Sequence, residues 1–458
     1  MSLERVLSYL EQNRERHVAQ LCDFLRIPSI SSVSAHKEDV RRAARFCADE
    51  LRDLGLRVEI SEPADGNPLV YAETEQRDGR PTLLVYGHYD VQPVDPLDLW
   101  RTPPFEPRVE DDVVYARGAT DDKGQLYAHF KALEAYVKQG LQPPVNLKFI
   151  IEGEEECGGH SVYAYTEANA GKLACDAVAV SDTSLYDERT PALTYSLRGL
   201  AYFEILVSGP KADLHSGSYG GGVQNPAHAL CDIIARLKDA DGRVRVPGFY
   251  DDVLDLDAAE REAFRSLDFS EKAFLADTGS PAAWGEKGYT TLERMWGRPT
   301  CDVNGLWSGY SGEGAKTIIP ALAGAKVSTR LVPQQDPHRI AAAFEAYVRS
   351  IAPAGVRVDV KTLHTAQPVL IERDSPWMKA GLRALELGFG AKPVFIREGG
   401  SIPIVTTFQN CLRVPVLLLG FGLATDNAHS PNEKFNLASY RNGARAVVHL
   451  WQEARRPV

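Results

Sequence analysis

Four short apolar runs dominate the sequence, and each leads into a histidine or a carboxylate. The runs 82–87 (TLLVYG), 145–151 (VNLKFII) and 176–181 (DAVAVS) are almost continuously apolar, and 414–420 (VPVLLLG) has the same character. Such runs are typical of strands in a parallel sheet that is covered on both faces. A helical pattern over 124–140 separates the first two runs, so the order predicts an α/β sheet.

The pattern changes after the third run. Residues 202–209 (YFEILVSG) alternate more, a helical stretch (NPAHALCDIIARL) follows, and the charged segment 250–295 shows no strand pattern. The stretches AKVSTRLVP, HRIAAAFEAYVRSI and VRVDVKTL then complete a β-α-β-α-β order. We therefore predict a mostly parallel α/β domain of residues 1–191 and 370–458, with helices on both faces, interrupted by a smaller α+β, ferredoxin-like domain of residues 192–369.

Composition and charge exclude several classes of function. No apolar run in the 458 residues approaches the roughly 18 that a membrane span needs. The opening MSLERVLSYLEQNRERH reads as an amphipathic helix and not as a secretory signal. A net charge of -11 without a basic patch argues against nucleic-acid binding. Seven scattered cysteines without a CxxC pair suit a reducing compartment, so we expect a cytoplasmic protein whose metals, if any, sit on His, Asp and Glu.

Histidines and carboxylates gather where the predicted strands end, and ligands of open α/β sheets bind beyond those ends. They follow the four runs and open the helix after 120: His88 and Asp90, Asp121 and Asp122, Glu152 and Glu154–Glu156, Asp182, Asp426 and His429. Two histidines and three carboxylates suit a pair of zinc or similar ions, each held by one histidine, one private carboxylate and one shared carboxylate.

Nine motifs occur along the chain in a fixed order: GHYDVQPVD, ARGATDDKGQ, EGEEECGG, VSDTS, DLHSGSYGGG, AKTIIP, STRLVP, REGGSIP and AHSPNEKF. In this order they resemble the M20-type metallopeptidases, in particular the carnosinase-like, cytosolic non-specific dipeptidase branch. The resemblance extends from about residue 26 to residue 440, which is nearly the whole chain.

This resemblance implies the ligands of a two-metal centre. His88, Asp121 and Asp182 would hold one ion, and His429, Asp121 and Glu156 the other, so that Asp121 bridges them. We expect two divalent ions per chain, with Zn²⁺ favoured and Mn²⁺ or Co²⁺ as alternatives.

The resemblance also assigns residues beside the metals. Asp90 would orient the His88 imidazole. Glu155 would be the general base: it would take a proton from the water that becomes the metal-bridging hydroxide, and would pass that proton to the leaving nitrogen. It further implies a cis peptide bond between Asp121 and Asp122.

Four further residues are implied to bind substrate, three of them in the inserted domain. His215 would reach the active site of a partner subunit and stabilise the oxyanion, which makes the inserted domain a lid and a homodimerisation domain. Arg330 would take the substrate's free carboxylate, helped by Thr317 and Ser401. The alternatives are a loop histidine bonded to its own backbone and an internal ion pair of Arg330.

The leading hypothesis is therefore a broad-specificity, di-metal dipeptidase. One alternative is an N-acyl-amino-acid deacylase or carboxypeptidase of the same superfamily, and another is a non-catalytic binding protein on a peptidase-like fold. Side-chain preference depends on pocket shape, which the sequence does not define.

Three adjacent glutamates, Glu154–Glu156, carry a local prediction. In a regular strand Glu155 and Glu156 would point to opposite faces, so we expect the strand to have ended by Glu154. Glu154 is then a bystander or a supporting charge, and Cys157 a small, inert neighbour.

Overall fold

The computed structural model describes residues 2–455, and within it the chain forms two compact units. The first unit comprises the chain up to Tyr195, Ile371–Ile396, and the chain from Ile404 onward. The second comprises Ser196–Leu370 and Arg397–Pro403. The first unit is thus built from both ends of the chain, and the second is inserted into it.

A mixed sheet forms the centre of the first unit. Its main path runs β1 (Arg57–Ser61), β2 (Leu69–Glu73), β6 (Asn146–Glu152), β3 (Thr82–His88), β7 (Ala177–Val180), β17 (Val416–Leu418) and β8 (Ala192–Leu197), while β16 (Val394–Glu398) pairs with β8. The central strands β6, β3, β7 and β17 are parallel to one another. These four strands are the four apolar runs, so their carboxyl ends share one edge of the sheet.

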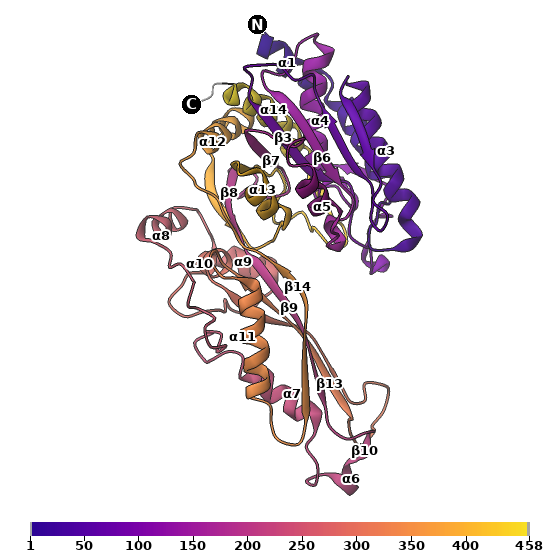
Figure 1. Ribbon diagram of the computed structural model, residues 1–458, viewed down its shortest axis with the longest axis vertical. Coiled ribbons are helices and arrows are strands. Elements are labelled where there is room, and N and C mark those ends of the chain that lie inside the picture. The colour runs from indigo at the N-terminus through magenta and orange to yellow at the C-terminus, as the bar shows by residue number, and fades with distance from the viewer. Residues whose placement is uncertain (1, 456–458) are drawn as a thin grey trace. The chain divides into compact units, whose positions relative to one another are not determined.

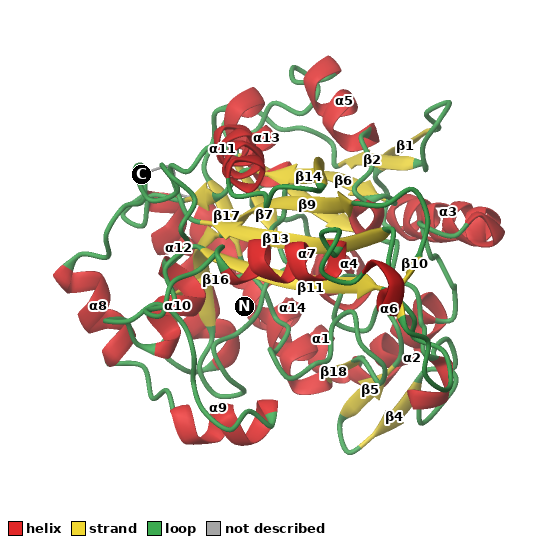
Figure 2. Ribbon diagram, turned by 90° about the horizontal axis from the view of Figure 1, so that it is seen from below, coloured by secondary structure: helices red, strands yellow, loops and turns green. Residues whose placement is uncertain are grey.

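Helices cover both faces of this sheet, which explains the continuous apolar runs. Figures 1 and 2 show α4 (Lys123–Lys138) and α14 (Leu437–Ala454) on one side of the strands, and α5 (Ser161–Ala168) and α13 (Ile404–Leu412) on the other. Every residue of β6 and β7 is buried. A strand with both faces covered has no solvent side on which to place polar residues. The predicted α/β fold with a parallel central sheet is confirmed.

Four further helices belong to the first unit. They are α1 (Ser2–Gln12), α2 (Arg14–Leu25), α3 (Lys37–Asp53) and α12 (Pro376–Phe389). The predicted N-terminal amphipathic helix is therefore two helices that meet at Asn13. Across residues 2–455, none of the helices combines the length and the apolar character that crossing a bilayer requires.

The second unit has the β-α-β-β-α-β order of a ferredoxin-like domain. Its antiparallel sheet runs β11 (Thr300–Ser308), β13 (Leu322–Leu331), β9 (Gly199–Ser208) and β14 (Arg357–Ala366), with α7 (Pro226–Ala235) and α11 (Pro337–Ser350) as the two helices. Residues of β9 are buried alternately and share one core with residues of both helices, including a stacked Phe203–Phe344 pair at 4.0 Å. The predicted smaller α+β insertion is confirmed.

Strand β11 and the helices of the charged segment before it were not predicted from the sequence. Strand β11 is mostly exposed, and a bulge between Val303 and Gly305 breaks its alternation, so its apolar signal is weak. The charged segment before it folds into α8 (Ala258–Arg265), α9 (Glu271–Thr278) and α10 (Thr291–Gly297). The β-α-β-α-β order predicted from the sequence is therefore wrong by one strand.

Candidate metal centre

The structure brings the five predicted ligands together beyond the parallel strand ends. His88 is the last residue of β3, and Asp182 follows β7 by two residues. Asp121 stands just before α4, Glu156 lies in a short 3-10 turn after β6, and His429 lies in the loop after β17. Segments from far apart in the sequence meet here because parallel strands end at the same edge.

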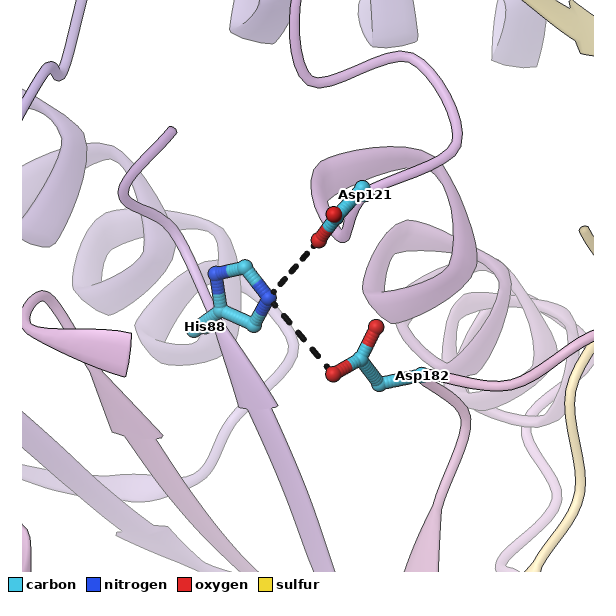
Figure 3. A group of neighbouring side chains, drawn as sticks. All are labelled: His88, Asp121 and Asp182. Carbon is cyan, nitrogen blue, oxygen red and sulfur yellow. Dashed lines mark ion pairs between the residues drawn. The ribbon is translucent and has the colours of Figure 1, made fainter. Parts of the chain in front are cut away.

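His88, Asp121 and Asp182 form the first of two ligand sets (Figure 3). The His88 Nε2 atom lies 3.1 Å from Asp121 Oδ1 and 3.8 Å from Asp182 Oδ2. The His88 side chain is fully buried, and its Nε2 atom has no hydrogen-bond partner among the described residues. A buried imidazole nitrogen that faces two carboxylate oxygens is the arrangement that a divalent cation between them requires.

Asp121, Glu156 and His429 form the second set, which adjoins the first. The His429 Nε2 atom lies 2.8 Å from Asp121 Oδ2 and 3.2 Å from Glu156 Oε2. One oxygen of Asp121 therefore faces His88 and the other faces His429. This geometry suits one carboxylate shared between two ions, each with its own histidine and its own private carboxylate.

The charges of the protein alone show why this site needs cations. Hydrogen bonds to Asp121 and Glu156 raise the pKa of His429 to about 11. Burial, together with the neighbouring Asp121 and Asp122, raises the pKa of Asp182 well above its ordinary value. Both shifts lower the negative charge of a crowded acidic site. Two dications would perform the same compensation while leaving the carboxylates ionised.

The turn after β6 orients the adjacent glutamates. Strand β6 ends at Glu152 and a 3-10 turn begins at Glu155, so the prediction that the strand has ended by Glu154 is confirmed. Gly158 closes the turn at φ 68°, a left-handed conformation that favours glycine. Burial and the charges of Glu156, Asp121 and Asp90 raise the pKa of Glu155 to about 8, and His88 opposes them. Glu155 thus lies within the field of both ligand sets but belongs to neither.

Glu154 has a structural task that the sequence left undefined. Its buried carboxylate accepts hydrogen bonds from the backbone N–H of Asn67 (2.6 Å) and of Ser161 (3.0 Å) at the start of α5. A Cβ atom on Gly66 or Gly159 would collide with this carboxylate, so both positions require glycine. Glu154 therefore ties two chain segments to the turn that presents Glu155 and Glu156.

Asp90 links the two ligand sets. The His88 Nδ1 atom lies 3.1 Å from the Asp90 carbonyl oxygen and 3.4 Å from Asp90 Oδ1, while Asp90 Oδ2 accepts the backbone N–H of Glu156 at 3.1 Å. With Nδ1 as the donor, Nε2 is left free to bind a metal. Gln92, which the sequence analysis missed, donates to Glu156 Oε2 at 2.8 Å. Its position four residues after His88 was the available signal, but an amide alone does not indicate a metal site.

Asp122 and Cys157 sit beside the ligands. Asp122 is buried, and its Oδ2 accepts the backbone N–H of His88 at 3.2 Å. The peptide bond between Asp121 and Asp122 is cis, as the resemblance implied. Cys157 is exposed and its thiol contacts the Glu154 carbonyl at 3.5 Å.

The four predicted substrate residues form two pairs within the second unit. Arg330 Nη1 donates to Ser401 Oγ at 3.3 Å, and Ser401 in turn donates to the Arg198 carbonyl. The other pair is His215 and Thr317. His215 ends β10 (Leu214–His215), and the backbone N–H of the next residue, Ser216, donates to the Thr317 carbonyl at 3.1 Å.

The tautomer of His215 follows from its own loop. Its Nδ1 accepts the backbone N–H of Gly217 at 3.0 Å, so in the neutral ring the proton is on Nε2. The imidazole is exposed, and its Nε2–H is available as a donor. The predicted alternative of a histidine bonded to its own backbone is thus present, and it sets the tautomer that an oxyanion donor needs.

Comparison with known proteins agrees with the fold and the site. Residues 84–453 match the model of peptidase family M20/M25/M40. The chain is 33% identical to the Cys-Gly metallodipeptidase of Schizosaccharomyces pombe over 97% of both chains. Among solved structures, it resembles the di-peptidase Dug1p of Saccharomyces cerevisiae (TM-score 0.88, 30% identity, 100% of both chains) and human carnosine dipeptidase 1 (TM-score 0.87, 29% identity, 99% of both chains).

An α/β sheet with two adjoining His-carboxylate sets at its carboxyl edge defines the protein as a metal-dependent hydrolase of the peptidase class. The chain belongs to peptidase family M20/M25/M40. The resemblance seen in the motifs is confirmed.

Glu154→Ala should lower stability without removing metal, because it leaves the N–H groups of Asn67 and Ser161 without an acceptor. Each unpaired donor costs about 1–3 kcal/mol in the free energy of unfolding, measured by urea denaturation. The control is Glu75→Ala, whose side chain is 80% exposed, with an expected change within about 0.5 kcal/mol. Unchanged stability together with a lost metal ion would instead make Glu154 a ligand.

Proposed function

We propose that this protein hydrolyses dipeptides at a two-metal centre held by His88, Asp121 and Asp182 on one side and by His429, Asp121 and Glu156 on the other. The observation that carries the proposal is the shared Asp121, whose two oxygens face the two histidines at 3.1 and 2.8 Å. Two bound divalent ions would lower the pKa of a water and polarise the scissile carbonyl.

The protein's own groups would move the protons. Glu155 stands next to the ligand Glu156 without belonging to a ligand set, and its raised pKa gives it affinity for a proton. It would take a proton from the attacking water and deliver it to the leaving amine nitrogen. His215, protonated on Nε2, would donate to the oxyanion of the tetrahedral species.

The proposed substrate class is supported by the positively charged side chain of Arg330 and by the relatives. Burial lowers the pKa of Arg330, and no salt bridge to a carboxylate is found for it among the described residues, so its guanidinium suits an incoming anion. The free carboxylate of a dipeptide is that anion, with Thr317 and Ser401 as further donors. The relatives named above, a Cys-Gly metallodipeptidase and a carnosine dipeptidase, act on such substrates.

We favour Zn²⁺ as the ion, with Mn²⁺ or Co²⁺ as alternatives, because mixed nitrogen and oxygen ligands accept all three. We also propose a cytoplasmic location. It is supported by seven cysteines that are all free in the structure.

A substrate panel tests the proposed function. Free dipeptides should give kcat/KM values well above those of N-acetyl and N-succinyl amino acids, and dipeptide amides should be poor substrates. Arg330→Ala should raise KM and remove most of the discrimination between a dipeptide and its amide. Preference for the acyl compounds would establish the deacylase alternative instead, and no activity after addition of Zn²⁺ or Mn²⁺ would support a non-catalytic binding protein.

Glu155→Gln tests the proton transfer. The amide cannot accept a proton, so kcat should fall by about 10²- to 10⁴-fold while two metal ions per chain are retained by elemental analysis. Glu156→Gln provides the contrast, since loss of a ligand should reduce metal content as well. If Glu155→Gln lost metal and activity together, Glu155 would be a ligand and the base would lie elsewhere.

We further propose that the second unit forms a homodimer that brings His215 to the active site of the partner subunit. Its support is a group of exposed apolar side chains on and beside β11 and β13: Leu306, Trp307, Tyr310 and Leu322. Exposed apolar groups of this kind mark protein interfaces.

Trp307→Glu should therefore yield a monomer in sedimentation velocity, with metal content unchanged and most activity lost. Trp284→Glu is the matched control, because Trp284 is 72% exposed in the same unit but lies outside the sheet. A fully active monomeric wild type would refute the dimer and the role of His215.

A further inference from the structure

The carboxylate of Glu433 accepts four hydrogen bonds, and all of its donors come from one loop. Its Oε1 accepts the backbone N–H groups of Thr120 (3.0 Å) and Asp121 (3.1 Å). Its Oε2 accepts Arg117 Nη1 (2.7 Å) and the backbone N–H of Gly118 (2.9 Å). Glu433 is fully buried, more than 300 positions along the chain from this loop.

A second carboxylate joins the same two loops. Asp426, also buried, accepts the hydroxyl of Thr120 at 3.0 Å and the backbone N–H of Leu423 at 2.8 Å. Asp426 and Glu433 stand three positions before and four positions after His429, which has a left-handed backbone at φ 60°. The loop that carries His429 is therefore bound at both ends to the loop that carries Asp121.

The geometry points to Glu433 as a positioning residue that holds the Asp121 loop and the His429 loop in register, and thereby sets the affinity of the second metal site. Two of the three ligands of that site, His429 and Asp121, lie on the loops that Glu433 joins. In the first site, His88 and Asp182 stand at strand ends that Glu433 does not touch. Loss of Glu433 should therefore weaken the second site more than the first.

Glu433→Gln tests this inference with little change in shape. All four partners of the carboxylate are donors, so no orientation of a glutamine amide accepts from both pairs. The amide nitrogen would face either Arg117 and Gly118 or Thr120 and Asp121 donor to donor. One side of the connection between the loops must then open.

The measurement is Zn²⁺ binding to the metal-stripped full chain, by competition with a chromophoric chelator. Asp182→Ala removes a ligand of the first site, so that only the second site is intact, and Glu156→Ala leaves only the first site intact. Adding Glu433→Gln should raise the Zn²⁺ dissociation constant about 10- to 100-fold in the Asp182→Ala background, the range known for groups that orient metal ligands. The change in the Glu156→Ala background should be several times smaller.

The matched control is Glu134→Gln. Glu134 is also buried in the first unit, accepts Lys131 Nζ at 2.7 Å and Tyr9 Oη at 2.8 Å, and lies about 16 Å along α4 from its start at Lys123. It should lower the unfolding midpoint and leave both Zn²⁺ affinities unchanged. If Glu433→Gln behaved in the same way, or weakened both sites equally, Glu433 would be merely structural and the inference would be overturned.

A milder pair of variants covers the case in which Glu433→Gln does not fold. Thr120→Val removes the hydroxyl that donates to Asp426, and Thr120→Ser keeps it. Zn²⁺ affinity of the second site should fall with valine and recover with serine, and equal affinities for the two would overturn the inference.

The inference rests on the proposed two-metal centre, but the two can fail separately. A wild type that binds fewer than two Zn²⁺ per chain would contradict the two-metal centre itself. Two bound Zn²⁺ with unchanged affinities in Glu433→Gln would contradict only the role of Glu433.

Discussion

The carboxylate of Asp121 faces two imidazoles at once, and the arrangement of the whole site depends on this contact. Its oxygens lie 3.1 Å from the Nε2 of His88 and 2.8 Å from that of His429. Burial alone would raise the pKa of Asp121, but the neighbouring imidazoles of His429 and His88 lower it, so this carboxyl stays ionised. An ionised, half-buried carboxylate between two imidazoles creates a negative field that favours cations, and the neighbouring acids strengthen it.

Acids hold other acids in place around this centre, through backbone N–H groups. Asp90 accepts the N–H of Glu156, Asp122 that of His88, and Glu433 that of Asp121. Glu154 accepts the N–H groups of two other segments and so secures the glutamate turn. Each of these supporting carboxylates accepts at least one backbone N–H group, whereas Asp121, Asp182 and Glu156 each direct an oxygen toward the Nε2 atom of His88 or His429. This difference in partners, and not the residue type, separates a supporting carboxylate from a ligand.

Much of the fold was predictable because it depends on local pattern. The runs at β3, β6, β7 and β17 are apolar on both faces, and only a covered parallel sheet accommodates such strands. Strand β11 was not predictable in this way, because it is mostly exposed and interrupted by a bulge at Val303–Gly305. It forms through pairing with β13, a contact between segments that a local pattern does not report.

The sequence by itself determined which residues would gather at the edge of the sheet, since strand ends that carry His88, Asp182 and His429 must meet if the strands are parallel. It also determined the break after β6, because alternation would have separated Glu155 from Glu156. Only the tertiary structure decided which carboxylates support and which face the centre. The bonds of Glu433 to the Asp121 loop and of Glu154 to Asn67 and Ser161 join segments far apart in the chain, and such partners exist only after folding.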